Sequence, residues 1–97
     1  MYRVVLACEG IPAMEGPEAA RDIAHEFAQF RTHYGKAACE FADGLLMLTA
    51  ESDFDSDGRN LLDEFSDCIA AYVATPFDGR LRIVSAKVVD TPESQQG

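Results

Sequence analysis

Four short apolar segments of this chain have the pattern that is typical of β-strands. Residues 2–8 and 80–89 are short, apolar and rich in branched side chains. Residues 37–42 and 45–50 are also apolar, and Asp43-Gly44 separates them. This dipeptide tolerates the positive φ angles of a type I′ turn. The pattern therefore predicts four strands, of which the second and third form a hairpin.

Two other segments repeat apolar residues at every third or fourth position, as amphipathic helices do. The first runs from Pro17 to about His33, because proline suits the first helical position and Gly35 can end a helix. The second begins at Leu61 and continues to about Ala74. The sequence therefore predicts two helices, one after the first strand and one before the last.

The predicted order is strand, helix, strand, strand, helix, strand. With right-handed crossovers and both helices on one face, this order gives a four-stranded antiparallel sheet with strand order 4-1-3-2. The topology resembles the ferredoxin-like βαββαβ sandwich, an α+β fold that hosts unrelated activities and implies no function by itself. At 97 residues and 47% hydrophobic content, the chain is long enough for one core. We expect a single α+β domain at residues 1–90 and a flexible C-terminal tail at residues 91–97.

The face of this sheet that the helices leave open is apolar in either strand orientation. The first strand leaves either Tyr2, Val4, Leu6 and Cys8 or Val5 and Ala7 on that face, and the third strand leaves either Leu45 and Met47 or Leu46 and Leu48. A contiguous apolar patch is usually an interaction site. We therefore expect a homodimer that forms through the open face of the sheet.

The charge of the chain limits the partners that it can have. Eight Lys and Arg stand against 17 Asp and Glu, which gives a net charge of −9. Nucleic acids and anionic membranes attract basic faces, so we expect neither as a partner. No apolar run approaches a signal peptide's core or the ~20 residues of a membrane span. We expect a cytoplasmic protein whose partners are cations, basic proteins or small neutral ligands.

Residues 51–67 hold seven of the acidic residues and a single arginine. Within this stretch, residues 53–64 match the pattern D-x-D-x-D-G-x₅-E and so resemble the calcium loop of EF-hand proteins. The resemblance implies a Ca²⁺ or other divalent-cation site. Its ligands would be the carboxylates of Asp53, Asp55, Asp57 and Glu64 and the carbonyl of Arg59. The loop departs from the pattern at Asn60, where an aliphatic residue is usual, and a strand precedes it instead of a helix.

A second interpretation of the same loop needs no metal. Asp53, Asp55, Ser56 and Asp57 could cap the second helix by accepting its free backbone N–H groups. Gly58 would then lie in the first helical turn, where glycine is unfavourable, and this argues against capping. His33, Lys36 and Lys87 would approach the loop in the predicted topology and partly neutralise it.

The remaining candidate chemistry is sparse. Cys8, Cys39 and Cys68 have no CxxC spacing, which indicates reduced thiols buried as small hydrophobic side chains. Arg80 and Arg82 share one face of an edge strand, where charges discourage further strand pairing. No set of catalytic residues is evident. We favour a non-enzymatic binding or regulatory module. One alternative is an acidic inhibitor or immunity-type protein that blocks a basic partner, and another is a small dimeric ferredoxin-like enzyme.

Overall fold

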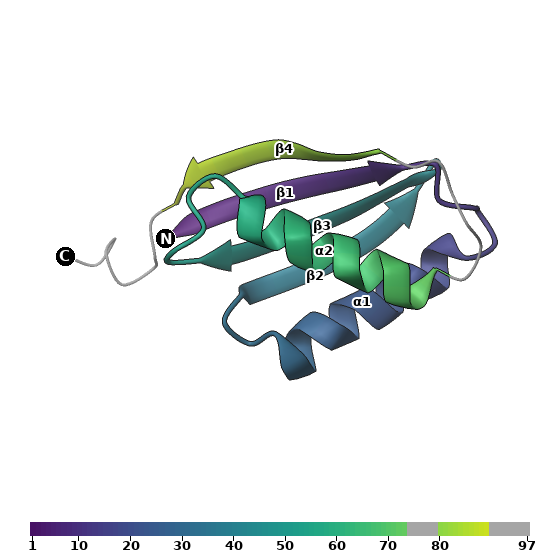
Figure 1. Ribbon diagram of the computed structural model, residues 1–97, viewed down its shortest axis with the longest axis horizontal. Coiled ribbons are helices and arrows are strands. Elements are labelled where there is room, and N and C mark those ends of the chain that lie inside the picture. The colour runs from purple at the N-terminus through teal and green to yellow at the C-terminus, as the bar shows by residue number, and fades with distance from the viewer. Residues whose placement is uncertain (74–79, 90–97) are drawn as a thin grey trace.

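The computed structural model describes residues 1–73 and 80–89, so the predicted tail at residues 91–97 lies outside the described residues. The elements are β1 (Tyr2–Glu9), α1 (Gly16–Phe30), β2 (Gly35–Ala42), β3 (Leu45–Ser52), α2 (Arg59–Tyr72) and β4 (Leu81–Val88). The strands form one sheet in the order β2-β3-β1-β4, in which every neighbouring pair is antiparallel (Figure 1). This is the predicted 4-1-3-2 order read from the opposite edge, and the ferredoxin-like fold is confirmed.

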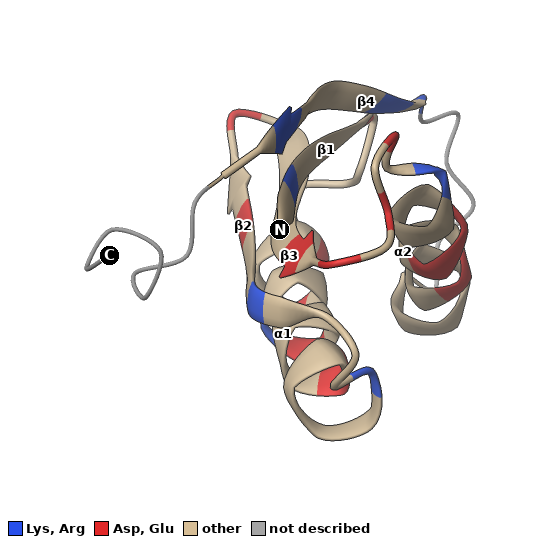
Figure 2. Ribbon diagram, turned by 90° about the vertical axis from the view of Figure 1, so that its left-hand side faces the viewer, with Lys and Arg blue, Asp and Glu red and all other residues tan. Residues whose placement is uncertain are grey.

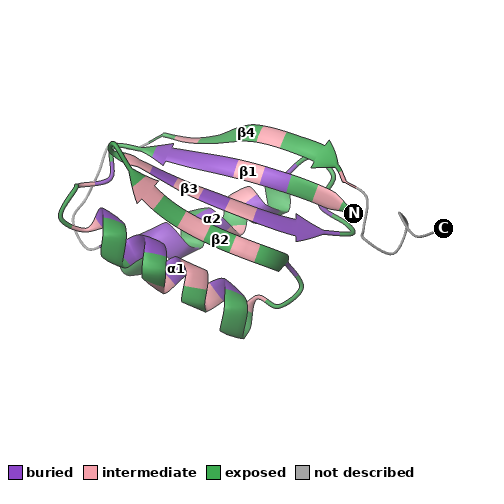
Figure 3. Cartoon of the chain, turned by 180° about the vertical axis from the view of Figure 1, so that it is seen from behind, coloured by how far each residue is buried: buried purple, intermediate pink, exposed green. Residues whose placement is uncertain are grey.

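Both helices lie on the same side of the sheet, and the core fills the space between them and the two central strands (Figures 1 and 3). Alternate residues of β1 and β3 point towards the helices and are at most 1% exposed: Val4, Leu6, Cys8, Leu46, Leu48 and Ala50. The helices contribute Ile23, Phe27, Leu61, Phe65 and Ile69. Each large apolar side chain that is buried in this way stabilises the fold by about 1.5–3 kcal/mol.

The first helix ends three residues earlier than the sequence predicts. Arg31, with φ −124° and ψ 53°, has already left the helical conformation, so the expected end at His33 is wrong. The early end lets Tyr34 turn into the core, where it is 4% exposed and packs edge-on against Phe27 with ring centroids 5.8 Å apart. Gly35 therefore opens β2 and does not end the helix.

Two turns depend on positive φ angles. Asp43 (φ 53°) and Gly44 (φ 76°) both adopt them, which confirms the predicted hairpin turn. Gly58 (φ 82°) precedes α2 as its N-cap residue, so its expected place in the first helical turn is wrong. A Cβ atom at Gly58 would lie 2.8 Å from Cγ1 of the buried Val4. Glycine is therefore needed at position 58 both for its backbone conformation and for its size.

This pair of glycines gives a matched test of the close approach between α2 and β1. Gly44→Ala meets no atom within 4 Å, so it should cost only the positive-φ penalty, about 1–2 kcal/mol. Gly58→Ala adds an overlap with Val4, and we expect it to cost at least about 1 kcal/mol more. Denaturant unfolding of both variants measures the difference. Equal losses of stability would contradict the packing of the α2 N-terminus on β1.

Candidate functional site

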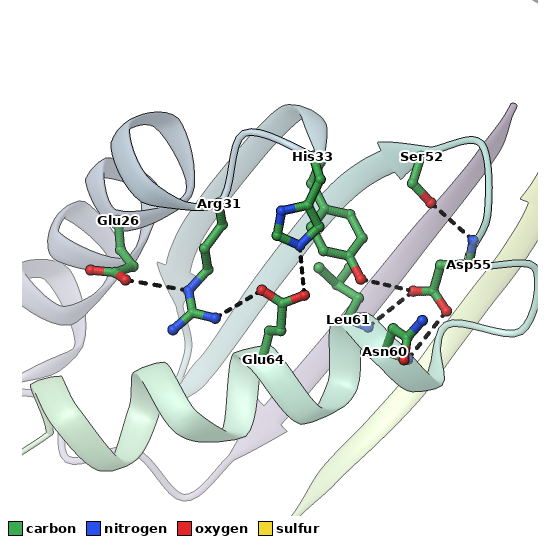
Figure 4. Close-up of polar contacts among 9 residues, drawn as sticks. Glu26, Arg31, His33, Ser52, Asp55, Asn60, Leu61 and Glu64 are labelled. Atoms are coloured by element: carbon green, nitrogen blue, oxygen red, sulfur yellow. Dashed lines mark hydrogen bonds and ion pairs between the residues drawn. The ribbon is translucent and has the colours of Figure 1, made fainter.

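The acidic loop before α2 is organised by one buried carboxylate. Asp55 is 2% exposed, and its two oxygens accept hydrogen bonds from the backbone N–H groups of Asn60 (3.2 Å) and Leu61 (3.0 Å) (Figure 4). The backbone N–H of Asp55 itself donates to Oγ of Ser52 at 3.1 Å. A negative charge is thus placed at the positive end of the helix, where it satisfies two otherwise free donors.

Asp57 makes a similar but exposed contact. Its Oδ1 accepts a hydrogen bond from the backbone N–H of Arg59 at 3.1 Å, and its Oδ2 lies 3.6 Å from Nε of the same arginine. The capping interpretation is therefore confirmed for Asp55 and Asp57. The argument from Gly58 against it fails, because a glycine just before the helix with positive φ is favourable.

Glu64 connects the two helices. Its carboxylate accepts hydrogen bonds from Nη1 of Arg31 at 2.8 Å and pairs with Nε2 of His33 at 2.9 Å (Figure 4). The guanidinium of Arg31 also lies 3.3 Å from the carboxylate of Glu26. Burial disfavours the charged form of Glu64, but the hydrogen bonds from His33 and Arg31 outweigh it and hold the pKa of this carboxyl below its usual value.

A second ion-pair cluster lies at the end of β3. Arg3 donates to Oε2 of Glu51 through Nε (3.0 Å) and Nη2 (2.8 Å), and Nζ of Lys36 lies 3.9 Å from the other oxygen. The predicted approach of His33 and Lys36 to the acidic stretch is confirmed at Glu64 and Glu51. Sequence reasoning did not identify Arg3 or Arg31, because strand and helix periodicity reveal no long-range ion pair.

The five residues predicted to bind calcium do not converge in this structure. Asp55 faces the N-terminus of α2, whereas Glu64 faces α1, and Asp53, Asp57 and Arg59 are exposed. Within residues 1–73 and 80–89, no three His, Cys, Asp or Glu side chains are grouped as a metal site would require. Calcium binding stays a prediction. A bound ion would have to draw Asp55 from the helix and Glu64 from its two basic partners.

Of the two sets of β1 residues that the sequence predicts for the open face of the sheet, the structure places the smaller one there, Val5 and Ala7. Val5 and Ala7 of β1 and Leu45 and Met47 of β3 alternate with the residues that fill the core, so they project to the open face. Ala7 is nevertheless 0% exposed, and the other three are partly exposed. A hollow of about 270 Å³ opens on this face over the β2–β3 hairpin. Its lining residues are Glu40, Ala42, Asp43, Leu45 and Met47. This apolar face, with its charged margins, is the candidate functional site.

The charges on the open face differ between its two edges. Residues 80–89 contain Arg80, Arg82 and Lys87 but no acidic residue. The opposite edge, formed by β2 and its turn, has Glu40 and Asp43 next to the hollow. Figure 2 shows the same division, with basic positions on β4 and acidic positions on β2 and the hairpin. The face is therefore basic along one edge and acidic where the hollow lies.

The thiols have the buried character that the sequence indicates. All three cysteines are free; Cys8 and Cys68 are buried, and Cys39 is partly buried and packs against the core. Burial, reinforced by neighbouring charge, raises the pKa of Cys8 to about 11 and that of Cys39 to about 12. The thiolate form is therefore disfavoured at neutral pH at both positions.

Searches of protein-family models, curated proteins and solved structures found no significant match to this chain. Among the residues that the structure describes, no helix has the length and apolar character to cross a membrane. The function must therefore be argued from the surfaces described above.

The capping role of Asp55 can be tested against a neighbour in the same loop. Asp55→Ala removes the acceptor of two backbone donors in a buried setting, and we expect a loss of about 2 kcal/mol or more. Asp53→Ala changes an exposed position and should alter stability by less than about 0.5 kcal/mol. Thermal and denaturant unfolding measure both. Equal effects would contradict the cap.

Glu64 should make the stability of the fold depend on pH. The pKa of Glu64 is lower in the folded state than in the unfolded state, where it is near 4.5. The carboxylate therefore stabilises the fold fully above pH 4.5, and this stabilisation is lost as the pH falls through the pKa of the folded state. Glu64→Gln should therefore cost about 1–2 kcal/mol at pH 7, and this cost should shrink as the pH falls below about 4.5. Unfolding curves across this range, with Asp67→Asn as the exposed control on α2, measure the difference. A constant difference between Glu64→Gln and the unmodified chain would contradict the account.

Proposed function

We propose that this chain is a small acidic, non-enzymatic binding module of the cytoplasm that acts as a homodimer through the open face of its sheet. The observation that supports this proposal is the apolar centre of that face, where Val5, Leu45 and Met47 are partly exposed around the fully buried Ala7. Three free thiols, each at least partly buried, fit a reducing compartment. In a monomer, the open face of the sheet would meet only water, and a polar face would be expected there.

The size of the face is compatible with a reversible dimer. Each strand has eight residues, so the four strands cover roughly 19 × 26 Å, or about 500 Å² per subunit, with ordinary strand spacing and rise. A standard protein interface buries about 800 Å² per partner. We therefore expect an affinity in the micromolar range, with association detectable at tens of micromolar.

The distribution of acidic residues also favours this face over the helix side. Asp57, Asp63 and Asp67 are exposed and belong to α2 and the loop before it, on the helix side of the molecule. Figure 2 shows acidic positions along α2 on that side. Two copies that meet through their sheets keep these residues at the far ends of the assembly. Repulsion between two chains of net charge −9 is therefore weakest in this arrangement.

The same exposed acidic residues support a second candidate function, the binding of a basic protein. This acidic surface consists of the exposed Asp53, Asp57, Asp63 and Asp67. Among the ion pairs of the described residues, only that between Asp57 and Arg59 involves any of them. Binding of a basic partner to this surface would slow steeply as salt is added, because electrostatic steering is screened. Dimerisation through an apolar sheet face would not weaken in this way.

Dimerisation can be tested with two methionines that differ in position. Met47 lies on the open face, whereas Met14 is 94% exposed in the loop before α1. Sedimentation equilibrium at tens of micromolar should give about twice the chain mass of 10.6 kDa. Met47→Lys should raise the dimer dissociation constant by on the order of 100-fold, because it places a charge in an apolar interface twice. Met14→Lys should leave it unchanged.

Two further variants separate loss of the dimer from loss of the fold. Leu46 and Leu48 point into the core and are fully buried, so Leu46→Lys and Leu48→Lys should unfold the chain whatever its oligomeric state. A 10.6 kDa monomer for the unmodified protein would contradict the proposed homodimer. It would also strengthen the acidic surface as the functional site.

A further inference from the structure

A row of four residues crosses the open face, one from each strand. Glu40 of β2 is the register partner of Met47 in β3, which pairs with Ala7 in β1, which in turn pairs with Arg82 in β4. Directly paired residues of neighbouring strands project to the same face. From one edge of the sheet to the other, the row therefore reads acid, methionine, alanine, base.

We infer that two copies of the chain pack open face to open face about a two-fold axis that runs parallel to the strands, between β1 and β3. This inference rests on the proposed homodimer and specifies its geometry. Rotation about this axis places β2 of one copy on β4 of the other. Each residue keeps its position along the strand direction, so every row faces the same row of the partner. The rotation brings Glu40 of one copy opposite Arg82 of the partner subunit, twice in each dimer.

The neighbouring rows fit the same axis. One row contains Ala38, Thr49, Val5 and Ser85, which are small or branched and let two sheets approach. The next contains Gly35, Glu51, Arg3 and Lys87. Rotation brings Arg3 opposite Glu51 of the partner subunit, and Lys87 opposite the partner's Gly35, which has no side chain. These two rows therefore add a second set of opposite charges. One like-charge approach opposes them, because Lys36, whose Nζ lies 3.9 Å from Glu51, is next to Gly35 and would face Lys87 of the partner subunit.

A two-fold axis perpendicular to the strands gives a worse match. It would place β4 on β4 with reversed direction, so that Arg82 approaches Lys87 of the partner subunit and two basic edges face one another. Like charges brought together in an interface oppose association. The charge pattern of the face therefore distinguishes the two orientations and selects the axis parallel to the strands.

The side chains can make the required contact. Packed sheets lie about 10 Å apart and are rotated by about 30°, which shifts an edge strand by on the order of one residue, a distance that arginine and glutamate can span. Within its own chain, Nε of Arg82 lies 3.7 Å from Oε2 of Glu9, and both side chains are more than half exposed. Such an exposed pair is weak, so Arg82 can turn towards a partner.

Charge reversal at the two ends of the row tests the axis. Glu40→Lys and Arg82→Glu should each weaken the respective homodimer by about tenfold, because each places like charges opposite one another at two symmetric positions. An equimolar mixture of the two variants should recover the dissociation constant of the unmodified protein. In that heterodimer, both contacts again join opposite charges. Sedimentation velocity measures all of these affinities, and circular dichroism checks that each variant is folded.

Two control variants match the changes in net charge without touching the open face. Arg59→Glu and Glu18→Lys alter exposed helical positions and should leave dimerisation unchanged. If either single reversal fails to fold, Glu40→Gln and Arg82→Gln replace the pair. Each homodimer should then weaken less, and mixing should recover part of the affinity, because the heterodimer keeps one of the two Glu40–Arg82 contacts. A dimer that is insensitive to both reversals, or a mixture that does not recover, would overturn the axis but leave the homodimer standing. A monomeric unmodified protein would overturn both.

Discussion

Side chains alternate between the two faces of a β-strand, and β1 and β3 carry apolar residues on both faces, although their outward faces also hold Arg3, Glu9, Thr49 and Glu51. The inward set, from Val4 to Cys8 and from Leu46 to Ala50, is almost completely covered by α1 and α2. Two helices of 15 and 14 residues can cover only one face of a four-stranded sheet. The core of the subunit therefore depends on the inward alternation. The outward alternation, from Val5 to Ala7 and from Leu45 to Met47, is what remains for a partner.

The acidic stretch shows how charge is handled next to this core. Its buried carboxylates are all engaged: Asp55 by the N-terminus of α2, Glu51 by Arg3, and Glu64 by Arg31 and His33. Its other acidic residues are exposed, where water screens them. The stretch therefore has a structural role in joining α1, β1 and α2.

Local patterns in the sequence were enough to predict the fold but not the details of the site. The strand and helix periods and the Asp43-Gly44 turn give the element order, and the topology follows from it. The end of α1 at Phe30 was not predictable from the helix periodicity, because the apolar positions continue up to that residue and give no stop signal. The packing of Tyr34 against Phe27 is a tertiary contact, and it sets the point where the chain turns. The close approach of Gly58 to Val4, a residue more than 50 positions away in the chain, likewise cannot be seen in a local pattern.

The open face illustrates the same division between local and long-range information. Alternation alone left two sets of residues for that face, and it took the packing of the helices to select Val5, Ala7, Leu45 and Met47. The row from Glu40 to Arg82 depends on the register of three strand pairs, including a shift next to Val5 in the pairing with β4. No local sequence pattern encodes such a register. The charge complementarity of the face is therefore visible only in the folded chain.

The central claim, that the open faces of two copies meet, is tested most directly by isotope-filtered NMR on a mixture of ¹³C-labelled and unlabelled chains. The spectrum records only contacts between different chains. The account predicts intermolecular NOEs between the methyl groups of Val5 and the γ-methyl group of Thr49, because the two-fold axis places these partly exposed residues opposite one another. An absence of intermolecular NOEs at a concentration of several hundred micromolar, or NOEs from helical residues such as Phe30 in their place, would contradict it.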